Sequence, residues 1–467
     1  MDDFIFVLGS NWKLSLAELD MVLKSNVYAG KINDYSSNIA SVKFNKLLKQ
    51  EYYVDHLENL QYYLGGTQKV ARIFDFFNIF TLKSAFPLNI DNFNEVKRAR
   101  KKIKQILKNN LEKIFRQIED RDIFFAVSIY PNLFDDKYYR EVLVKHFLPF
   151  LNKNISKILK EKGANKAIYF KYPEKNITSG NLNPIFPHHV IKYELLKENR
   201  AELIFAITEE GCYFGRTFTA DDPNFKRKVD EERPHKDFKS SISPKLAIMM
   251  LNFLNIFDNR HQKRILDPFV GNGTIALFAL IEDFNIYGSD VEKEKVEHTK
   301  KNIRWLQKEL EIPQIPKISE RFRTINIKHL SNQFEHEFFD GIVSEPDLGP
   351  FYTEEPYSIE VIELFETKLE PLYDIIFREA YKLLKHDSRI CIVAPSISLV
   401  DDTSDKRMDI QKIATRHNFR PIPLISSKRI TNKSNEILQF RKQKLYSIMD
   451  TKPGQIIKRK IFVFQKS

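Results

Sequence analysis

The spacing of hydrophobic residues divides the chain into two regions with different patterns. Before residue 220, the short apolar runs FIFVLG (4–9), IFFAVSIY (123–130) and AELIFAIT (201–208) predict strands. Residues 97–115 predict a helix, because their apolar positions recur on one face. Ser15 and Glu18 have the spacing of a capping box, which predicts that a helix begins there. This mixture predicts one or two small α+β units.

From residue 244 onward, predicted strands and helices alternate regularly. Three strands are predicted at RILD (264–267), IYGSD (286–290) and FDGIVSEP (339–346). Apolar or amphipathic stretches of helical length lie between them. Such alternation predicts an α/β domain with a doubly wound parallel sheet. The two last predicted strands, RPIPLISS and IKRKIFVF, have no helix between them and predict a closing antiparallel hairpin. Residues 219–243 are rich in Asp, Pro, Lys and Arg, and we expect them to be a linker.

Composition narrows the class of protein. With 467 residues, 42% of them hydrophobic, the chain predicts two or three globular domains. It contains no apolar run of membrane-spanning length and no basic N-terminal leader, so we expect neither a membrane partner nor secretion. Two cysteines suit a reducing cytoplasm, and we expect no metal site. The net charge of +12 favours a nucleic-acid partner, although a Lys-rich proteome would have the same effect.

The sequence LDPFVGNGT (266–274) has the features of a cofactor loop. Asp267 ends a strand, glycines permit a tight turn, and the next helix begins near Thr274, where its N-terminus favours an anionic group. Asp290 ends the next strand and could accept both ribose hydroxyls. Asn326 could bind an adenine amine or simply start a loop. The residues predicted to bind the cofactor are Asp267, Phe269, Gly271, Gly273, Thr274, Asp290 and Asn326.

The same glycines also match the G-x-G-x-x-A pattern of dinucleotide-binding folds. Three features favour S-adenosylmethionine over a dinucleotide. An acid-Pro-aromatic triplet precedes the glycines, the fourth strand ends in an acidic loop with prolines, and the chain closes in a hairpin. A dinucleotide enzyme would instead carry a second mononucleotide-binding half.

Several of these motifs together resemble a known family. LDPFVGNGT resembles the loop of methyltransferases that act on exocyclic amines, and residues 232–253 resemble the entry segment of tRNA guanine-N(2) methyltransferases that modify guanosine ten. The stretches at 4–23, 179–207 and 452–466 are similar to that family in the same order. The resemblance implies an N-terminal ferredoxin-like domain (1–80), a THUMP-like RNA-binding domain (81–218), and a Rossmann-like, seven-stranded methyltransferase domain (244–467). It also implies S-adenosyl-L-methionine as cofactor and tRNA as partner.

The predicted catalytic loop, SEPDLGPFY (344–352), departs from the Asp/Asn-Pro-Pro-aromatic pattern of the family. An exocyclic amine is a poor nucleophile, so catalysis needs acceptors that hold its hydrogens and a surface that stacks the base. Glu345 and the Pro346 carbonyl fit the acceptor role, and Asp347 is a candidate second acceptor. Phe351 or Tyr352 could replace the missing stacking aromatic.

Basic residues outside the catalytic loop are candidates for phosphate contacts or for plain solvated charge. They are Arg216, Lys226 and Arg227 near the linker, and the basic face at 97–104. We therefore predict an S-adenosylmethionine-dependent RNA methyltransferase, with tRNA guanine-N(2) favoured. The alternatives are methylation of another RNA or DNA base amine, and a non-catalytic RNA-binding protein that retains the fold. The sequence leaves open which nucleotide is methylated, and whether an activating subunit is needed.

Overall fold

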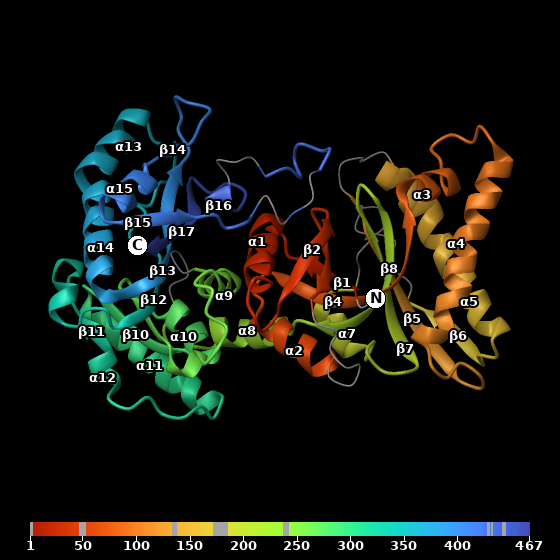
Figure 1. Ribbon diagram of the computed structural model, residues 1–467, viewed down its shortest axis with the longest axis horizontal. Helices are drawn as coiled ribbons and strands as arrows, with labels where there is room; N and C mark the ends of the chain where they lie inside the picture. Colours follow the sequence, from red (N-terminus) through yellow and green to blue (C-terminus); the bar gives the residue numbers. More distant parts are fainter. Residues whose placement is uncertain are drawn as a thin grey trace.

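The computed structural model describes residues 3–45, 53–132, 138–170, 185–236, 242–426, 430, 433–440 and 445–467. The molecule is elongated, with two large sheets placed one after the other along its long axis (Figure 1). In the described part of the chain, no helix has both the length and the apolar character that a membrane span requires.

The first half of the N-terminal sheet has the ferredoxin-like arrangement that the sequence suggested. Its four strands are all antiparallel to their neighbours and follow the order β2-β3-β1-β4, with one helix after β1 and another after β3. The elements are β1 (Asp3–Leu8), α1 (Trp12–Val22), β2 (Gly30–Tyr35), β3 (Ile39–Phe44), α2 (Tyr53–Tyr63) and β4 (Thr67–Asn78).

The predicted capping box at the start of α1 is wrong. The helix begins earlier, and its N-cap is Asn11, whose side-chain oxygen accepts from the backbone N–H of Leu14 at 3.4 Å. Glu18 does not reach back to the helix start. Its two carboxylate oxygens instead accept the backbone N–H groups of Gly65 (2.8 Å) and Gly66 (2.7 Å). A distant loop therefore uses the carboxylate that the local pattern had assigned to capping.

The second half of this sheet continues directly from the first. Strand β8 pairs with β4 along nearly its whole length, which gives one sheet of order β2-β3-β1-β4-β8-β7-β5-β6. The two units expected on either side of residues 80 and 81 thus share one continuous sheet. The elements are α3 (Ile79–Ala85), α4 (Phe93–Ile114), β5 (Asp122–Tyr130), the π-helix η2 (Tyr138–Phe147), α5 (Leu148–Glu161), β6 (Lys166–Tyr169), α7 (Pro187–Lys192), β7 (Arg200–Ile207) and β8 (Gly211–Ala220).

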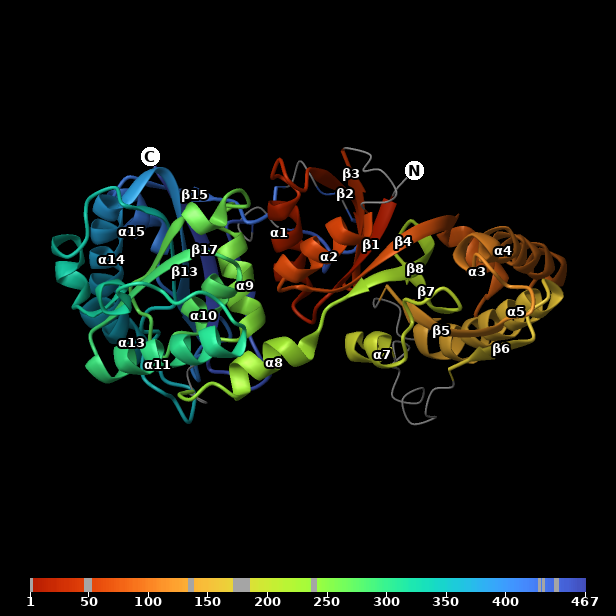
Figure 2. The same ribbon diagram turned by 90° about the horizontal axis from the view of Figure 1, so that it is seen from below.

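The segment expected as a linker contains a helix, α8 (Pro223–Glu231), which lies between the two sheets (Figure 2). Asp222 caps it by accepting from the backbone N–H of Asn224, and Pro223 occupies its first position, where a missing N–H costs nothing. Val229 is buried and anchors the helix. Residues 237–241 of the expected linker lie outside the described residues.

The C-terminal sheet has the strand order β11-β10-β9-β12-β13-β17-β15. Strands β11 to β13 run parallel, and β17 is antiparallel to both β13 and β15, so the predicted closing hairpin is confirmed. The elements are α9 (Pro244–Asn252), η3 (Arg260–Gln262), β9 (Arg264–Asp267), α10 (Thr274–Ile281), β10 (Asn285–Asp290), α11 (Lys293–Glu309), α12 (Ile318–Arg321), β11 (Phe322–Thr324), η4 (Ile327–Asn332), β12 (Phe339–Ser344), α13 (Ser358–Leu364), η5 (Phe365–Leu369), α14 (Glu370–Leu383), β13 (Leu384–Ile397), β14 (Lys406–Arg407), α15 (Ile410–Arg416), β15 (Phe419–Ile422), β16 (Ser447–Asp450) and β17 (Ile457–Lys466).

The C-terminal sheet is therefore the predicted Rossmann-like sheet, with the short strands β14 and β16 added at its side. Helices α9 to α11 contribute to one core, and helices α13 to α15 contribute to a second one. The first core also contains buried residues of α1 and α2, such as Leu16, Leu19 and Leu57, so it is continuous with the N-terminal region. The burial of apolar side chains thus joins the two sheets directly.

Polar contacts reinforce this junction at two places. On one side, the Asn252 amide of α9 donates to Glu18 (2.7 Å) and to the backbone carbonyl of Tyr63 (2.6 Å). On the other, residues 433–440 of the C-terminal region extend over strand β2. There the Tyr35 hydroxyl donates to the Leu438 carbonyl at 2.9 Å. The N-terminal region is thereby fixed at two separate points relative to the C-terminal sheet.

Candidate active site

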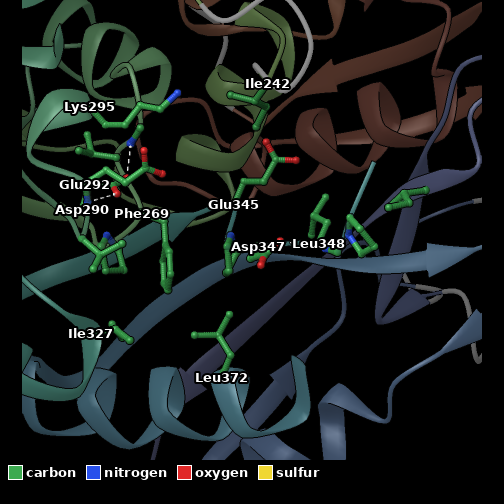
Figure 3. A pocket seen from close by; sticks show the side chains of 18 of the residues that line it. Ile242, Phe269, Asp290, Glu292, Lys295, Ile327, Glu345, Asp347, Leu348 and Leu372 are labelled. Atoms are coloured by element: carbon green, nitrogen blue, oxygen red, sulfur yellow. Dashed lines mark hydrogen bonds between the residues drawn. The ribbon is translucent and has the colours of Figure 1, made fainter. Parts of the chain in front are cut away.

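A pocket of about 1540 Å³ opens at the carboxyl ends of β9, β10, β11 and β12 (Figure 3). Ligands of doubly wound sheets bind at this edge. The pocket brings together most of the residues that the sequence predicted for the cofactor and the substrate. They are Asp267, Phe269, Gly271, Thr274, Asp290, Asn326, Glu345, Pro346, Asp347, Phe351 and Tyr352.

The glycine loop between β9 and α10 takes its shape from helix α11. The Thr299 hydroxyl donates to the Gly271 carbonyl at 2.7 Å, and the Asn302 amide donates to the Asn272 carbonyl at 2.8 Å. Both glycines have positive φ, +51° at Gly271 and +86° at Gly273, a conformation that L side chains rarely adopt.

The two glycines have different surroundings. A Cβ at Gly273 would lie 2.9 Å from the Thr299 side chain, so this glycine allows α11 to approach, and it does not line the pocket. A Cβ at Gly271 would meet no atom within 4 Å, and this glycine does line the pocket. Gly271 therefore leaves space for a ligand, whereas Gly273 leaves space for helix α11 to pack against the loop.

Asp290 is placed as the sequence predicted, at the end of β10 and half-buried at the pocket wall. Each of its carboxylate oxygens accepts one backbone N–H at 3.0 Å, one from Gly271 and the other from Glu292, as the dashed lines in Figure 3 mark. A carboxylate oxygen can accept more than one hydrogen bond. Both oxygens therefore keep capacity for a pair of ligand hydroxyls.

Asp267 is much more enclosed than Asp290, with a relative exposure of 1%. Its Oδ1 accepts from the Ser344 hydroxyl of β12 (2.7 Å) and from the backbone N–H of Phe269 (3.2 Å). Burial raises the pKa of Asp267 to about 7, and the nearby charges of Asp290 and Glu345 act in the same direction. Asp267 joins β9 to β12 at their carboxyl ends and lines the pocket.

Asn326 lies at the end of β11 and lines the pocket. Its side-chain oxygen accepts from the backbone N–H of Lys328 at 3.0 Å and caps helix η4. The loop-starting role is thus present in the structure. An amide oxygen has a second lone pair, so the cap does not prevent a contact with an adenine amine.

The entry segment before α9 contacts the glycine loop through residues that the sequence reading did not single out. The Arg233 guanidinium donates to the Thr274 hydroxyl at 2.8 Å and also pairs with Asp230 at 3.4 Å. The backbone of His235 exchanges two hydrogen bonds with the Asn302 amide, 2.9 and 2.7 Å long. These contacts explain why a motif about 40 positions before the loop accompanies it, but only the folded chain brings the two together.

Glu345, the predicted acceptor, follows β12 and lies at the pocket wall (Figure 3). Arg459 of β17 pairs with it: Nε lies 2.5 Å from Oε1, and Nη2 lies 3.4 Å from Oε2. Both side chains are largely buried, with 13% and 15% exposed. Burial raises the pKa of Glu345, and the Arg459 charge and hydrogen bonds oppose that rise.

Asp347 lines the same pocket but is engaged within its own loop. It accepts from the backbone N–H of Gly349 at 2.9 Å and pairs with Lys368 at 2.7 Å. Partial burial raises its pKa, but these contacts outweigh it, so the pKa lies below its ordinary value. Its side chain is 41% exposed, three times the fraction of Glu345. Asp347 therefore shapes the turn, and Glu345 is the better placed acceptor.

The two aromatic candidates for stacking a base differ in exposure. Phe351 is 79% exposed at the pocket rim. Tyr352 is half-buried and packs against the core beneath α13 and α14. Phe351 is therefore the better placed of the two to stack on a base.

Arg216 and Lys226 have partners within the protein, and their contact with phosphates stays a prediction. The Arg216 guanidinium donates to four backbone carbonyls, those of Ile114, Leu196, Lys197 and Arg200, and holds loops of the N-terminal sheet together. Lys226 is buried and pairs with Asp221 at 2.8 Å. Arg227 remains exposed and makes a long contact of 3.8 Å with Glu231. None of these three residues lines the pocket.

Comparison with known proteins identifies the class of the C-terminal domain. Residues 232–421 match the family model described as UPF0020, RMKL-like, methyltransferase domain. This match covers the entry segment, the glycine loop and the acceptor loop. Together with the strand order, it defines a methyltransferase domain with a Rossmann-like fold, as the sequence predicted.

The similar curated proteins carry a more specific name. Over 190 residues, 40% of this chain and 49% of the relative, the chain is 28% identical to a tRNA (guanine(10)-N2)-dimethyltransferase of Methanothermobacter thermautotrophicus. Over 176 residues, 37% of this chain and 45% of the relative, it is 24% identical to the protein of the same name from Pyrococcus abyssi. The chain thus matches about half the length of each relative, and the resemblance that the sequence motifs suggested is confirmed. Among solved structures, TrmN from Thermus thermophilus is 13% identical, with both chains covered in full and a TM-score of 0.48.

Proposed function

We propose that this protein is an S-adenosylmethionine-dependent RNA methyltransferase that acts on an exocyclic amine, with tRNA guanine-N(2) as the favoured target. One observation carries the proposal: a largely buried carboxylate, Glu345, lies in the same pocket as the Gly271–Asp290 contact at the predicted cofactor loop. The Glu345 carboxylate can accept the hydrogens of an amine. The Gly271–Asp290 contact suits the binding of a nucleoside. The names of the two curated relatives support the choice of tRNA guanine.

The residues around the cofactor loop fit S-adenosylmethionine. Asp290 has free acceptor capacity on both oxygens for the two ribose hydroxyls, and Gly271 leaves the backbone open to close approach. The N-terminus of α10, which begins at Thr274, favours the carboxylate of the methionine part. When bound, S-adenosylmethionine supplies an electrophilic methyl group on a sulfonium sulfur.

The chain's own residues would prepare the nucleophile. Glu345 accepts one hydrogen of the target amine, and the Pro346 carbonyl accepts the other, so that the nitrogen lone pair points to the methyl group. Phe351 stacks on the base and fixes its plane. As the new N–C bond forms, the bond between the methyl group and the sulfonium sulfur breaks, the amine must lose a proton, and the Glu345 carboxylate would take it.

RNA binding is proposed for the N-terminal region, with the ferredoxin-like (1–80) and THUMP-like (81–218) parts followed by the connecting segment 219–243 and the catalytic domain 244–467. The net charge of +12 supports this. On α4, basic side chains are exposed on the face opposite the buried apolar row; they include Lys97, Arg98, Lys101, Lys104 and Lys108. We also propose the cytoplasm as compartment, since Cys212 and Cys391 are buried and free.

A methyl-transfer assay tests the proposal. The full chain is incubated with methyl-labelled S-adenosylmethionine and unfractionated tRNA that lacks modifications, and the labelled nucleoside is identified after digestion. Label in N2-methylguanosine, lost with Glu345→Gln, supports it. Label in another nucleoside would keep the enzyme class and change the target. RNA binding without label in any RNA or DNA would leave a binding protein and overturn the proposal.

A further inference from the structure

Arg459 is a pocket residue that the proposed chemistry has not yet used. It lies on β17, which forms hydrogen bonds to β13 on one side and to β16 on the other. In register, Arg459 is opposite Pro395 of β13 and Asp450 of β16. The strand is continuous with the closing hairpin, so the guanidinium is held by a central part of the sheet and not by a loop.

The contact between Arg459 and Glu345 has the geometry of a fork. Two nitrogens of one guanidinium face the two oxygens of one carboxylate, at 2.5 and 3.4 Å. Such two-point contacts fix the orientation of a carboxylate as well as its distance, which a single ammonium group does not. Because both side chains are largely buried, solvent screens this pair less than a surface pair.

Among the described residues, three other titratable groups interact with Glu345, and they carry negative charge or none. Asp450 of β16 opposes the ionised form of Glu345, Asp267 of β9 lies close enough for the two carboxyls to affect each other, and the Tyr373 phenol of α14 is affected by the Glu345 charge. Arg459 is the positive charge that stabilises the ionised form of Glu345. The acceptor role requires an ionised carboxylate, and burial among acids works against it.

Asp450 itself is fixed from the N-terminal region. The Asn11 amide donates to Asp450 Oδ1 and to the Met449 carbonyl, both at 3.0 Å. Asn11 is also the N-cap of α1. The end of β16, directly beside Arg459, is thus attached to the part of the molecule proposed to bind RNA.

We propose that Arg459 is the positioning residue of the acceptor: it orients Glu345 toward the target amine and holds it in the ionised form. The inference rests on the proposed function and adds a residue that the acceptor loop does not contain. Loss of Arg459 should then act on catalysis through Glu345, and not through cofactor binding or through the fold.

The test uses the full chain with methyl-labelled S-adenosylmethionine and unmodified tRNA. Arg459→Met is expected to lower kcat on the order of 100-fold near neutral pH. Its activity should return as the pH rises, because the Glu345 carboxyl without its partner ionises only at a higher pH than in the unchanged protein. The matched control is Lys458→Met, which removes one positive charge from the next position of the same strand, where Lys458 pairs with Asp405 at 2.7 Å outside the pocket. This control should leave the kcat–pH profile unchanged.

Arg459→Lys separates orientation from charge. It should restore the pH profile, because a positive charge is present again, yet leave kcat roughly 10-fold low, because an ammonium cannot form the fork. A purely structural role would lower kcat and the melting temperature without moving the pH profile of either variant. That result would overturn the inference.

A second measurement does not depend on methyl transfer. Without its partner, Glu345 should be protonated in the folded state, so the melting temperature of Arg459→Met should fall more steeply with rising pH than that of the unchanged protein. The double variant Glu345→Gln/Arg459→Met should lose that extra slope. If the unchanged protein labels no RNA but the slopes behave as stated, the proposed function fails and the pairing stands. Equal slopes in all variants refute the pairing whatever the activity.

Discussion

Two loops at the same edge of the C-terminal sheet form the pocket, and they are held in different ways. The loop at 267–274 is fixed by backbone hydrogen bonds and by short contacts with α11, which follows it closely in the chain. The loop at 345–352 is fixed by ion pairs with Lys368, on the helical segment η5, and with Arg459, on β17, which is 114 positions from Glu345. The loop proposed for the cofactor thus takes its shape mainly from the helix that follows it, and the loop proposed for the substrate depends on a charge from a distant part of the chain.

This difference has a physical reason. A loop that presents backbone N–H groups needs positive φ and small residues at fixed positions, and these requirements appear in the sequence as a glycine motif. A buried carboxylate needs a counter-charge, and that charge can come from any element that the fold brings near. The same comparison predicts how substitutions in each loop change activity, stability and cofactor binding.

The largest effect is expected in the acceptor loop. Glu345→Gln should lower kcat by about 100- to 1,000-fold, the range found when one preorganised group is removed from an active site. Affinity for S-adenosylmethionine should stay within about twofold, because the cofactor loop is untouched. Single-turnover methyl transfer and calorimetric cofactor binding measure the two quantities. Asp347→Asn, in the same loop but bound to its own turn, is the control and should retain most activity.

The next effect is expected at the glycine that packs on α11. Gly273→Val should destabilise the domain by about 2–4 kcal/mol, because it combines an unfavourable φ with a clash against Thr299. Gly271→Ala, where a Cβ meets no atom within 4 Å, should cost about 1 kcal/mol. Denaturant unfolding without cofactor measures both. Equal losses would show that Thr299 does not restrict the loop.

A smaller effect is expected for the acid at the end of β10. Asp290→Ala should weaken S-adenosylmethionine binding by about 10- to 100-fold, because two charge-assisted hydrogen bonds are lost together with the contacts that hold Gly271. Glu292→Gln changes another carboxylate at the pocket wall and is the matched control. An unchanged dissociation constant for Asp290→Ala would remove this residue from the cofactor site.

The smallest effect concerns pH and stability at Asp267. Its folded pKa of about 7 lies above the unfolded value of about 3.9, so the folded state binds an extra proton in between. This stabilisation is full below about pH 4 and is lost as the pH rises through 7. Asp267→Asn keeps an acceptor for Ser344 but does not titrate. The variant should therefore gain roughly 2 kcal/mol relative to the unchanged protein between pH 5 and pH 8.

Denaturant unfolding at several pH values checks the Asp267 prediction. Asp290→Asn, which changes a half-buried carboxylate nearby, serves as the comparison. A pH-independent difference between Asp267→Asn and the unchanged protein would mean that Asp267 is ionised throughout this range.

Local patterns in the sequence were sufficient for the C-terminal sheet. The alternation of strands and helices predicted its parallel core and the closing hairpin, and the structure confirms both. Placement of Gly271, Asp290 and Glu345 in one pocket also agrees with the sequence, since strand ends of one parallel sheet meet at one edge. Sequence patterns predicted less well the partners of polar residues that can either serve a local role or bind elsewhere in the fold. Glu18 looked like a capping residue, and Arg216 and Lys226 looked like surface cations, yet Glu18 and Arg216 bind distant partners and Lys226 is buried beside Asp221.

The sequence by itself determined the class of the catalytic domain and placed the loops predicted for cofactor and substrate at the ends of their strands, because glycine positions and strand order can be recognised in a local stretch of residues. The tertiary structure alone decided which charges face that carboxylate, which cations are buried, and that the N-terminal strands form one sheet attached to α9. These features depend on contacts between residues far apart in the chain. Burial sets the strength of such contacts, and burial by a distant element cannot be predicted from a local pattern of residues.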